Sequence, residues 1–331
     1  MKRTTKKTTG NRRDAGGAPD PEAAFRRFLE ETGRRVLAGL DRHLPRESNR
    51  PPVIHRSMRY TALAEGKRLR PALVLLAYEA AGGRGSRADA VAAAVEMVHA
   101  FSLIHDDLPA MDDDAMRRGK PSNHVVFGEG VAILAGDALL ALAFQTLSGL
   151  RTSGRLGPET TLRLVEELSA AAGSRGVIGG QVLDLLSEGK TVPRSVVEYI
   201  HRQKTARLFV ASLRMGGIAA GTKPAILGRL SRYGEDLGTA FQIVDDLLGA
   251  SGSFRELGRD PGRDQARGKV TYPGVVGIPA AHRAVDRLLA RAGGEARRFG
   301  AHSVLFEGAL AVVDRRRRGE DGRLLGVAGR Q

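Results

Sequence analysis

Apolar residues recur every three or four positions along most of the chain, and this spacing is what most restricts its fold. It begins with Phe25, Phe28, Leu29, Val36 and Leu40, which would share one face of a helix. The same spacing returns in residues 73–81, 91–104, 131–147, 160–172, 196–215, 227–248 and 284–290. The alternating pattern typical of strands between hairpin turns is hard to find. Since 42% of the 331 residues are apolar, the chain can bury a sizeable core, and we expect an all-α, single-domain bundle of about ten helices.

Basic residues gather near both ends of a chain whose net charge is +15. Residues 1–13 contain six Lys and Arg and no acidic residue. We expect residues 1–20 to be a disordered basic tail, because such a segment buries too little apolar surface to offset its ordering entropy. Residues 315–318 are four consecutive arginines. Either cluster could bind nucleic acid or an anionic membrane, but no zinc-finger spacing or aromatic RNA-binding motif accompanies them. We interpret both as solvated surface and expect no nucleic-acid partner.

Several classes of protein are excluded by composition. The absence of Cys removes disulfide scaffolds, thiolate zinc sites and cysteine nucleophiles. No uninterrupted apolar run reaches the roughly 20 residues of a membrane-spanning helix, and Glu96, His99 and Ser102 interrupt one of the longest, residues 92–104. The first 20 residues hold no hydrophobic segment of the kind found in a signal peptide. We therefore expect a cytoplasmic protein with no transmembrane segment.

Two groups of aspartates each belong to an apolar helical segment. The first, Asp106, Asp107 and residues 112–114, follows the apolar segment 91–104, where the helix dipole already places negative charge. Crowded carboxylates repel one another and tend to bind protons or cations. The second group, Asp245 and Asp246, lies inside another apolar segment, which argues against a solvated acidic loop. Oxygen ligands without His or Cys suit Mg²⁺ bound to a diphosphate rather than zinc.

Basic residues accompany both acidic groups. They are Lys67, Arg70, Arg117, Arg118, Lys120, Lys204, Arg207 and Lys269. Each alone is a commonplace surface charge. Together they could serve one diphosphate bound through metal and a second bound without it, because Arg grips phosphate oxygens in a bidentate manner and Lys supplies a point charge.

Five motifs occur in an order that resembles the trans-isoprenyl diphosphate synthases, also called polyprenyl synthetases. They are GKRLRP (66–71), HDDLPAMDDDAMRRGKPSNH (105–124), GGQVLDL (179–185), KTARLF (204–209) and FQIVDD (241–246). The second is similar to the first aspartate-rich motif of the bacterial short-chain members. The resemblance runs from about residue 25 to residue 273 and is weaker beyond. It implies that residues 21–331 form one polyprenyl synthetase domain, an all-α barrel around a central cavity, and that the protein is a homodimer.

The resemblance also implies roles for individual residues. Asp106, Asp112 and Asp245 would bind about three Mg²⁺ ions per active site. Asp107 would support them, and Asp246 would accept hydrogen bonds from metal-bound water. The residues implied to contact the allylic diphosphate are Arg117, Lys204, Gln242, Arg259 and Lys269. Those implied to contact isopentenyl diphosphate are Lys67, Arg70, His99 and Arg118. Thr205 would direct its oxygen toward the allylic carbon, where cationic charge develops.

The activity implied is a Mg²⁺-dependent prenyl transfer. An allylic substrate, dimethylallyl or geranyl diphosphate, would ionise and condense with isopentenyl diphosphate, and proton loss would follow. Phe101 lies five residues before Asp106 and beside the small Ser102. In the family an aromatic residue at this position forms the floor of the cavity, which favours farnesyl diphosphate as product. The alternative is geranylgeranyl diphosphate, because chain length can also be set deeper in the cavity.

Three positions depart from the family pattern. Gly249 stands where the second acidic motif usually has a third Asp, Arg259 where Lys follows Gly, and Glu65 where Gly precedes GKRLRP. Gly249 would weaken the second metal site and leaves open a catalytically weak or regulatory subunit. A type I terpene cyclase is a further alternative, but it has no need of a second diphosphate site such as Lys67, Arg70 and Arg118 would form.

Overall fold

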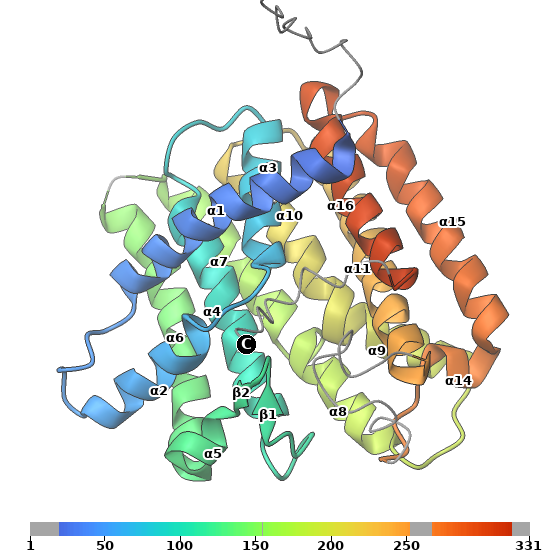
Figure 1. Cartoon of the computed structure of the whole chain (residues 1–331). Coiled ribbons are helices and arrows are strands. Elements are labelled where there is room, and N and C mark those ends of the chain that lie inside the picture. Colours follow the sequence, from blue (N-terminus) through green and yellow to red (C-terminus); the bar gives the residue numbers. More distant parts are fainter. Residues whose placement is uncertain (1–19, 154, 252–266, 320–331) are drawn as a thin grey trace, which may run out of the picture.

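The computed structural model describes residues 20–153, 155–251 and 267–319, and almost all of them outside short connections are helical (Figure 1). Residues 1–19 of the expected basic tail lie outside the described residues. Arg259 also lies outside them. The longer helices are α1 (Pro21–His43), α2 (Pro52–Ala62), α3 (Leu69–Ala80), α4 (Asp89–Asp106), α6 (Glu129–Thr152), α7 (Pro158–Ala172), α8 (Val177–Ser187), α10 (Arg207–Ala219), α11 (Pro224–Ser251), α15 (Ile278–Ala296) and α16 (Ser303–Arg317). The shorter ones are α5 (Asn123–Phe127), α9 (Arg194–Ile200), the π-helix η1 (His201–Ala206), α14 (Tyr272–Val276) and the 3₁₀ turn η2 (Gly300–His302). The all-α expectation is confirmed.

Helices α3 and α4 lie at the centre of the bundle. Residues 71–78 of α3 and 90–98 of α4 are buried without a break, as expected of helices that are apolar on every face. Helix α4 packs on α6, α3 and α1, and α10 packs on α3, α7 and α11. Helices α11, α15 and α16 pack together on one side, and α1 crosses the bundle to lie beside α16 (Figure 1). Segments from the two ends of the chain therefore belong to one core.

A two-stranded hairpin interrupts the helices, although the alternating pattern typical of strands is hard to find in the sequence. Strands β1 (Met116–Arg117) and β2 (Lys120–Pro121) pair antiparallel, with Arg117 opposite Lys120. Arg118 and Gly119 form the turn with φ values of 52° and 75°, the left-handed conformations that two-residue hairpin turns require. Strands of two residues are too short to show an alternating pattern. The hairpin nevertheless matters, because it points Arg117 and Arg118 in different directions.

The apolar segment 196–215 was expected to be one helix and is divided into three. Helix α9 leads into the π-helix η1, and α10 follows it. A π-helix accommodates extra residues within a turn and is often found at functional sites. Periodicity alone could not show it, since the apolar spacing hardly changes.

Helix α6 has the length and hydropathy of a membrane-spanning helix, although no such segment was expected from the sequence. Among the described residues it is the one helix long and apolar enough to cross a membrane. A search for uninterrupted apolar runs missed it, because Gly136 and Asp137 fall within it. Fewer than half of the residues in its most apolar stretch are buried, and it packs on α4, α2, α5 and α7. Core helices of water-soluble proteins pass the same test, so one such helix is weak evidence for a membrane span.

Candidate active site

The first acidic segment folds back on the end of α4. Asp106 is the last residue of α4, and the Asp112 amide donates a hydrogen bond to the Asp106 carbonyl at 2.7 Å. The Asp114 amide donates to the Asp107 carbonyl at 3.1 Å. Asp113, with φ at 46°, is exposed. The loop thus brings Asp106 and Asp112 together although six positions separate them.

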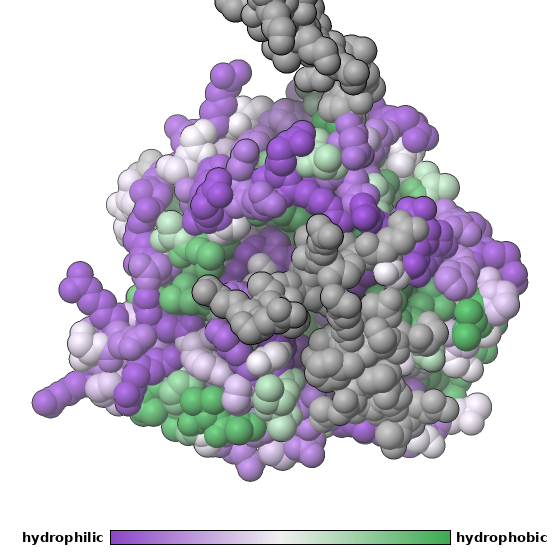
Figure 2. Space-filling model, viewed as in Figure 1, coloured by the Kyte–Doolittle hydropathy of each residue, from purple (hydrophilic) through white to green (hydrophobic). Residues whose placement is uncertain are grey.

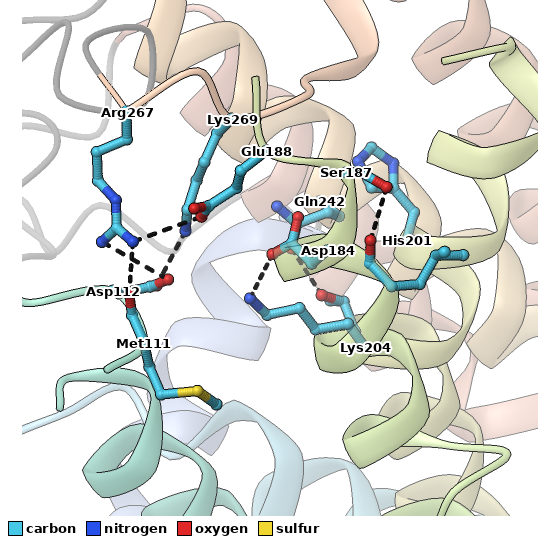
Figure 3. Close-up of polar contacts among 12 residues, drawn as sticks. Met111, Asp112, Asp184, Ser187, Glu188, His201, Lys204, Gln242, Arg267 and Lys269 are labelled. Atoms are coloured by element: carbon cyan, nitrogen blue, oxygen red, sulfur yellow. Dashed lines mark hydrogen bonds and ion pairs between the residues drawn. The ribbon is translucent and has the colours of Figure 1, made fainter. Parts of the chain in front are cut away.

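The electrostatic surroundings of Asp106 and Asp112 differ. Burial raises the pKa of Asp106 and Asp112 raises it further, against the opposing effect of Lys204. Burial also acts to raise the pKa of Asp112, but Lys204 and Lys269 more than offset it, and the net pKa is lowered. The Lys269 ammonium donates to Asp112 Oδ2 at 2.9 Å, and Arg267 Nη1 lies 3.9 Å from Oδ1 (Figure 3). Within this pair, the pKa of Asp106 is raised, chiefly by burial, and the pKa of Asp112 is lowered by its cations.

Lys204 faces these carboxylates from η1. Its Nζ atom lies 2.7 Å from Asp184 Oδ2 on α8 (Figure 3). Burial acts to lower the pKa of Lys204, but Asp106, Asp184 and Asp112 together raise it, so the side chain is an ammonium. Helix α8 approaches closely because Gly180 has no side chain: a Cβ there would lie 2.3 Å from the Lys204 amide nitrogen. The GGQ segment therefore positions the lysine through backbone packing.

The hairpin directs Arg117 toward Asp107. Arg117 Nε lies 2.6 and 2.8 Å from the two carboxylate oxygens of Asp107, and its Nη2 lies 3.8 Å from Asp114. Burial raises the pKa of Asp107 although Arg117 opposes the shift. Asp107 thus orients Arg117 beside the acidic loop.

The second acidic segment lies on α11, and its two aspartates have different partners. Asp246 Oδ2 accepts from the Tyr272 amide at 2.8 Å and lies 3.0 Å from His201 Nε2, and Oδ1 accepts from Gln242 Nε2 at 3.0 Å. Gln242 Oε1 in turn accepts from Thr205 Oγ1 at 2.7 Å. Asp246 therefore orients Gln242 and Thr205.

Asp245 contacts α16 and shares none of the hydrogen bonds described for Asp246. Its Oδ1 lies 2.6 Å from Nη2 of Arg316 on α16. Gly249, one helical turn further along α11, contributes no carboxylate.

A separate group of cations surrounds His99. Arg70 Nη1 lies 3.4 Å from His99 Nε2, and Arg118 donates to the Glu65 carbonyl at 2.9 Å. Burial, with Arg118, lowers the pKa of Arg70 to about 10, against Glu96 and Asp245, which raise it. Lys67 is half-buried in the same loop. The expected residues of the metal-free diphosphate site are thus brought together.

A buried ion pair supports this group from behind. Arg68 and Glu96 contact each other with only 4% and 3% of their side chains exposed. Glu96 Oε2 has no hydrogen-bond partner, and Arg68 holds the left-handed conformation with φ at 48°. The pair fixes the loop that carries Lys67 and Arg70 against α4.

The acidic residues fit Mg²⁺ better than a metal held by protein alone. Within residues 20–153, 155–251 and 267–319, no three His, Asp or Glu side chains lie close enough to hold a metal by themselves. Mg²⁺ keeps several waters and takes phosphate oxygens as ligands, so one or two carboxylates suffice. The all-oxygen donors Asp106 and Asp112, with the raised pKa of Asp106, match that chemistry.

Phe101 and Ser102 lie on α4 below the acidic loop. Phe101 is buried and meets the His105 ring edge-on, with ring centres 5.0 Å apart. Ser102 donates to the His99 carbonyl at 2.9 Å. Both therefore lie next to the candidate site along the same helix.

No role was assigned from the sequence to Asp184, Glu96, Arg267 or Arg316. Asp184 stands inside the GGQVLDL motif and could have been noticed there. Glu96 was seen only as an interruption of an apolar run. Nothing in the sequence singles out Arg267, and nothing shows which of four consecutive arginines points toward Asp245.

Comparisons with known proteins identify the family of the chain. The sequence matches the polyprenyl synthetase family over residues 51–299. It is 43% identical over 267 residues to the large subunit 1 of a heterodimeric geranylgeranyl pyrophosphate synthase from Arabidopsis thaliana chloroplasts, covering 80% of this chain and 71% of that one. It is 42% identical over 260 residues to farnesyl diphosphate synthase of Geobacillus stearothermophilus, covering 78% and 87%.

A solved structure supports the same assignment. The fold is similar to that of geranyltransferase from Helicobacter pylori complexed with magnesium and isoprenyl diphosphate, with a TM-score of 0.76 and 29% identity, covering 88% of this chain and 96% of that one. The chain therefore belongs to the polyprenyl synthetase family, whose members depend on Mg²⁺, and is a short-chain prenyltransferase of isoprenoid biosynthesis.

Proposed function

We propose that the protein condenses isopentenyl diphosphate with dimethylallyl and geranyl diphosphate to make farnesyl diphosphate. The observation that carries the chemistry is the arrangement of Asp106 and Asp112 facing Lys204, with a separate cation group around His99. One group suits a metal-bound diphosphate and the other a diphosphate without metal.

Asp106, Asp112 and Asp245 are the proposed Mg²⁺ ligands, for about three ions per active site. Bound Mg²⁺ would supply positive charge that stabilises the diphosphate as a leaving group. Lys204, Lys269, Arg117 and Gln242 are proposed to bind the allylic diphosphate. Arg259 is proposed to join them from outside the described residues. The described cations Lys204, Lys269 and Arg117 are held near the site by Asp184, Asp112 and Asp107, where they would meet phosphate oxygens.

Lys67, Arg70, His99 and Arg118 are proposed to hold isopentenyl diphosphate. Burial, followed by Arg70, Arg118, Arg117 and Arg68, keeps the pKa of His99 well below its ordinary value, so the imidazole is neutral and can donate a hydrogen bond without adding charge. The homoallylic double bond would attack the allylic carbon as its bond to oxygen breaks. The proton would leave with the departing diphosphate. Thr205 Oγ would face the cationic carbon, and the apolar helices would exclude water.

The proposed chain length depends on Phe101. It is buried on α4 one to two turns below Asp106, where an aromatic ring would limit the depth of the cavity beside Ser102. The Geobacillus farnesyl diphosphate synthase, at 42% identity, supports this product. The Arabidopsis geranylgeranyl pyrophosphate synthase, at 43% identity, supports geranylgeranyl diphosphate as the second candidate.

We further propose a homodimer in the cytoplasm. The support is an exposed apolar surface on α5 and α6, formed by Val125, Val126, Ile133 and Leu134. Figure 2 shows an apolar area over α5. A face of this kind on a helix that is otherwise packed in the core suits a second copy of the chain better than water. The domain is proposed to extend from residue 21, because α1 packs on α16.

One assay tests the function and the alternatives. Purified protein is incubated with Mg²⁺, labelled isopentenyl diphosphate and either dimethylallyl or geranyl diphosphate, and the dephosphorylated products are separated by chromatography. Farnesol as the main product supports the proposal, and geranylgeraniol supports the second candidate. Cyclic hydrocarbon from an allylic diphosphate alone would indicate a cyclase. No product without a partner chain would indicate a regulatory subunit.

A further inference from the structure

The arginine run at the end of α16 is engaged inside the molecule. Arg315 Nη1 lies 3.0 Å from Glu22 Oε1 on α1, and Arg317 Nη1 lies 2.6 Å from Asp286 Oδ1 on α15. Between them, Arg316 turns toward α11. The interpretation of residues 315–318 as a solvated surface is therefore wrong for Arg316 and Arg317, whose side chains are each only 14% exposed.

Two contacts orient the Arg316 guanidinium. Its Nη2 atom lies 2.6 Å from Asp245 Oδ1, and its central carbon lies 5.0 Å from the centre of the Phe241 ring. Phe241 and Asp245 are one helical turn apart and share a face of α11. Stacking of the planar guanidinium on an aromatic ring restricts its rotation, so the charge is directed at Asp245.

Asp245 is the half-buried carboxylate of the second acidic segment, with 28% of its side chain exposed. Asp246 is buried and uses its oxygens on His201, Gln242 and the Tyr272 amide. Gly249 lacks a carboxylate that could share the cation with Asp245. A metal ion on this side of the site therefore depends on Asp245, and Arg316 already contacts one of its two oxygens.

We propose that Arg316 is an internal counter-ion of Asp245 that competes with the divalent cation and so sets the metal concentration the enzyme requires. The inference rests on the proposed role of Asp245 as a metal ligand. A guanidinium bound at Oδ1 occupies one lone-pair direction of that oxygen, and its positive charge repels a metal ion bound to the same carboxylate. Because Arg remains charged throughout the physiological range, this competition persists at every working pH.

Metal affinity, measured without substrate, tests the proposal. Mn²⁺ alone is titrated into the full chain, and the remaining free ion is followed by electron paramagnetic resonance. Arg316→Gln should lower the dissociation constant of the Asp245-dependent sites by about three- to tenfold, which is the size expected of a partly buried ion pair. Arg316→Lys keeps the charge and should give a smaller decrease. Arg315→Gln, the matched control on the same helix, should bind Mn²⁺ like the wild type.

Asp245→Asn identifies the sites that belong to Asp245. If this variant binds Mn²⁺ more weakly and Arg316→Gln has no effect, the counter-ion proposal is overturned while the metal role of Asp245 stands. If Asp245→Asn binds like the wild type, the metal assignment fails as well. The double variant, Asp245→Asn with Arg316→Gln, should bind Mn²⁺ with the same affinity as Asp245→Asn alone. A thermal melt adds a second measurement: Arg316→Gln should melt lower than wild type without metal and gain more on addition of Mn²⁺, and an equal gain would also contradict the proposal.

Discussion

Substitution of Glu96 by Gln should lower the melting temperature of the protein by several degrees. Glu96 and Arg68 form an ion pair with 3% and 4% of their side chains exposed, and Glu96 also opposes the lowering of the pKa of the half-buried Arg70. The Gln side chain keeps the shape and a hydrogen bond but leaves these guanidinium groups without their nearest carboxylate. Removing one member of a buried ion pair typically costs about 3–5 kcal/mol.

This cost translates into a measurable shift. Roughly 300 ordered residues give an unfolding entropy on the order of 0.6 kcal/mol/K near the melting temperature. A loss of about 3 kcal/mol, the lower end of the range because Gln still accepts from Arg68, corresponds to about 5 °C. Circular dichroism melts of wild type and Glu96→Gln, without diphosphate or metal, measure the difference.

Two further variants test the reasoning. Glu198→Gln removes a carboxylate from an exposed pair with Arg194, 2.7 Å apart, and should change the melting temperature by no more than about 1 °C. Combining Glu96→Leu with Arg68→Met removes both buried charges and should recover most of the loss. A Glu96→Gln protein that melts within about 1 °C of wild type would refute the argument.

Three other predictions concern the site. Asp106→Ala should reduce kcat by at least about 100-fold, and chelation of Mg²⁺ should abolish turnover until the metal is restored; near-normal turnover in either case contradicts the assignment. The pKa of His99 is held well below its ordinary value by burial and the arginines around it, so the unfolded chain binds this proton more readily and stability falls as pH drops below about 6.5. His99→Gln should flatten the loss of denaturant stability between about pH 6.5 and 5, and an unchanged slope would count against a buried neutral imidazole. Phe101→Ala should shift products toward twenty carbons or longer with little loss of total condensation, whereas an unchanged product distribution would remove Phe101 from chain-length control.

The all-α fold could be predicted because helical periodicity is local. Segment 91–104 became α4 and segment 227–248 became α11, each extended by a few residues. The π-helix at residues 201–206 and the hairpin at Arg117 could not be predicted, because a wider turn and two-residue strands hardly alter the pattern. The π-helix sets the direction of the Lys204 side chain, and the hairpin sets the direction of Arg117.

The sequence by itself determined which chemical groups the site has, and the tertiary structure decided how they are paired. Aspartates at the end of one apolar helix and inside another indicated a cation and a diphosphate before any contact was known. Only packing brings Asp112 beside Lys269, Lys204 beside Asp184, and Arg316 onto Asp245, across separations of up to 157 positions. Local sequence limits the conformation of neighbouring residues, whereas the field at a carboxylate depends on every charge that the folded core brings within a few ångströms.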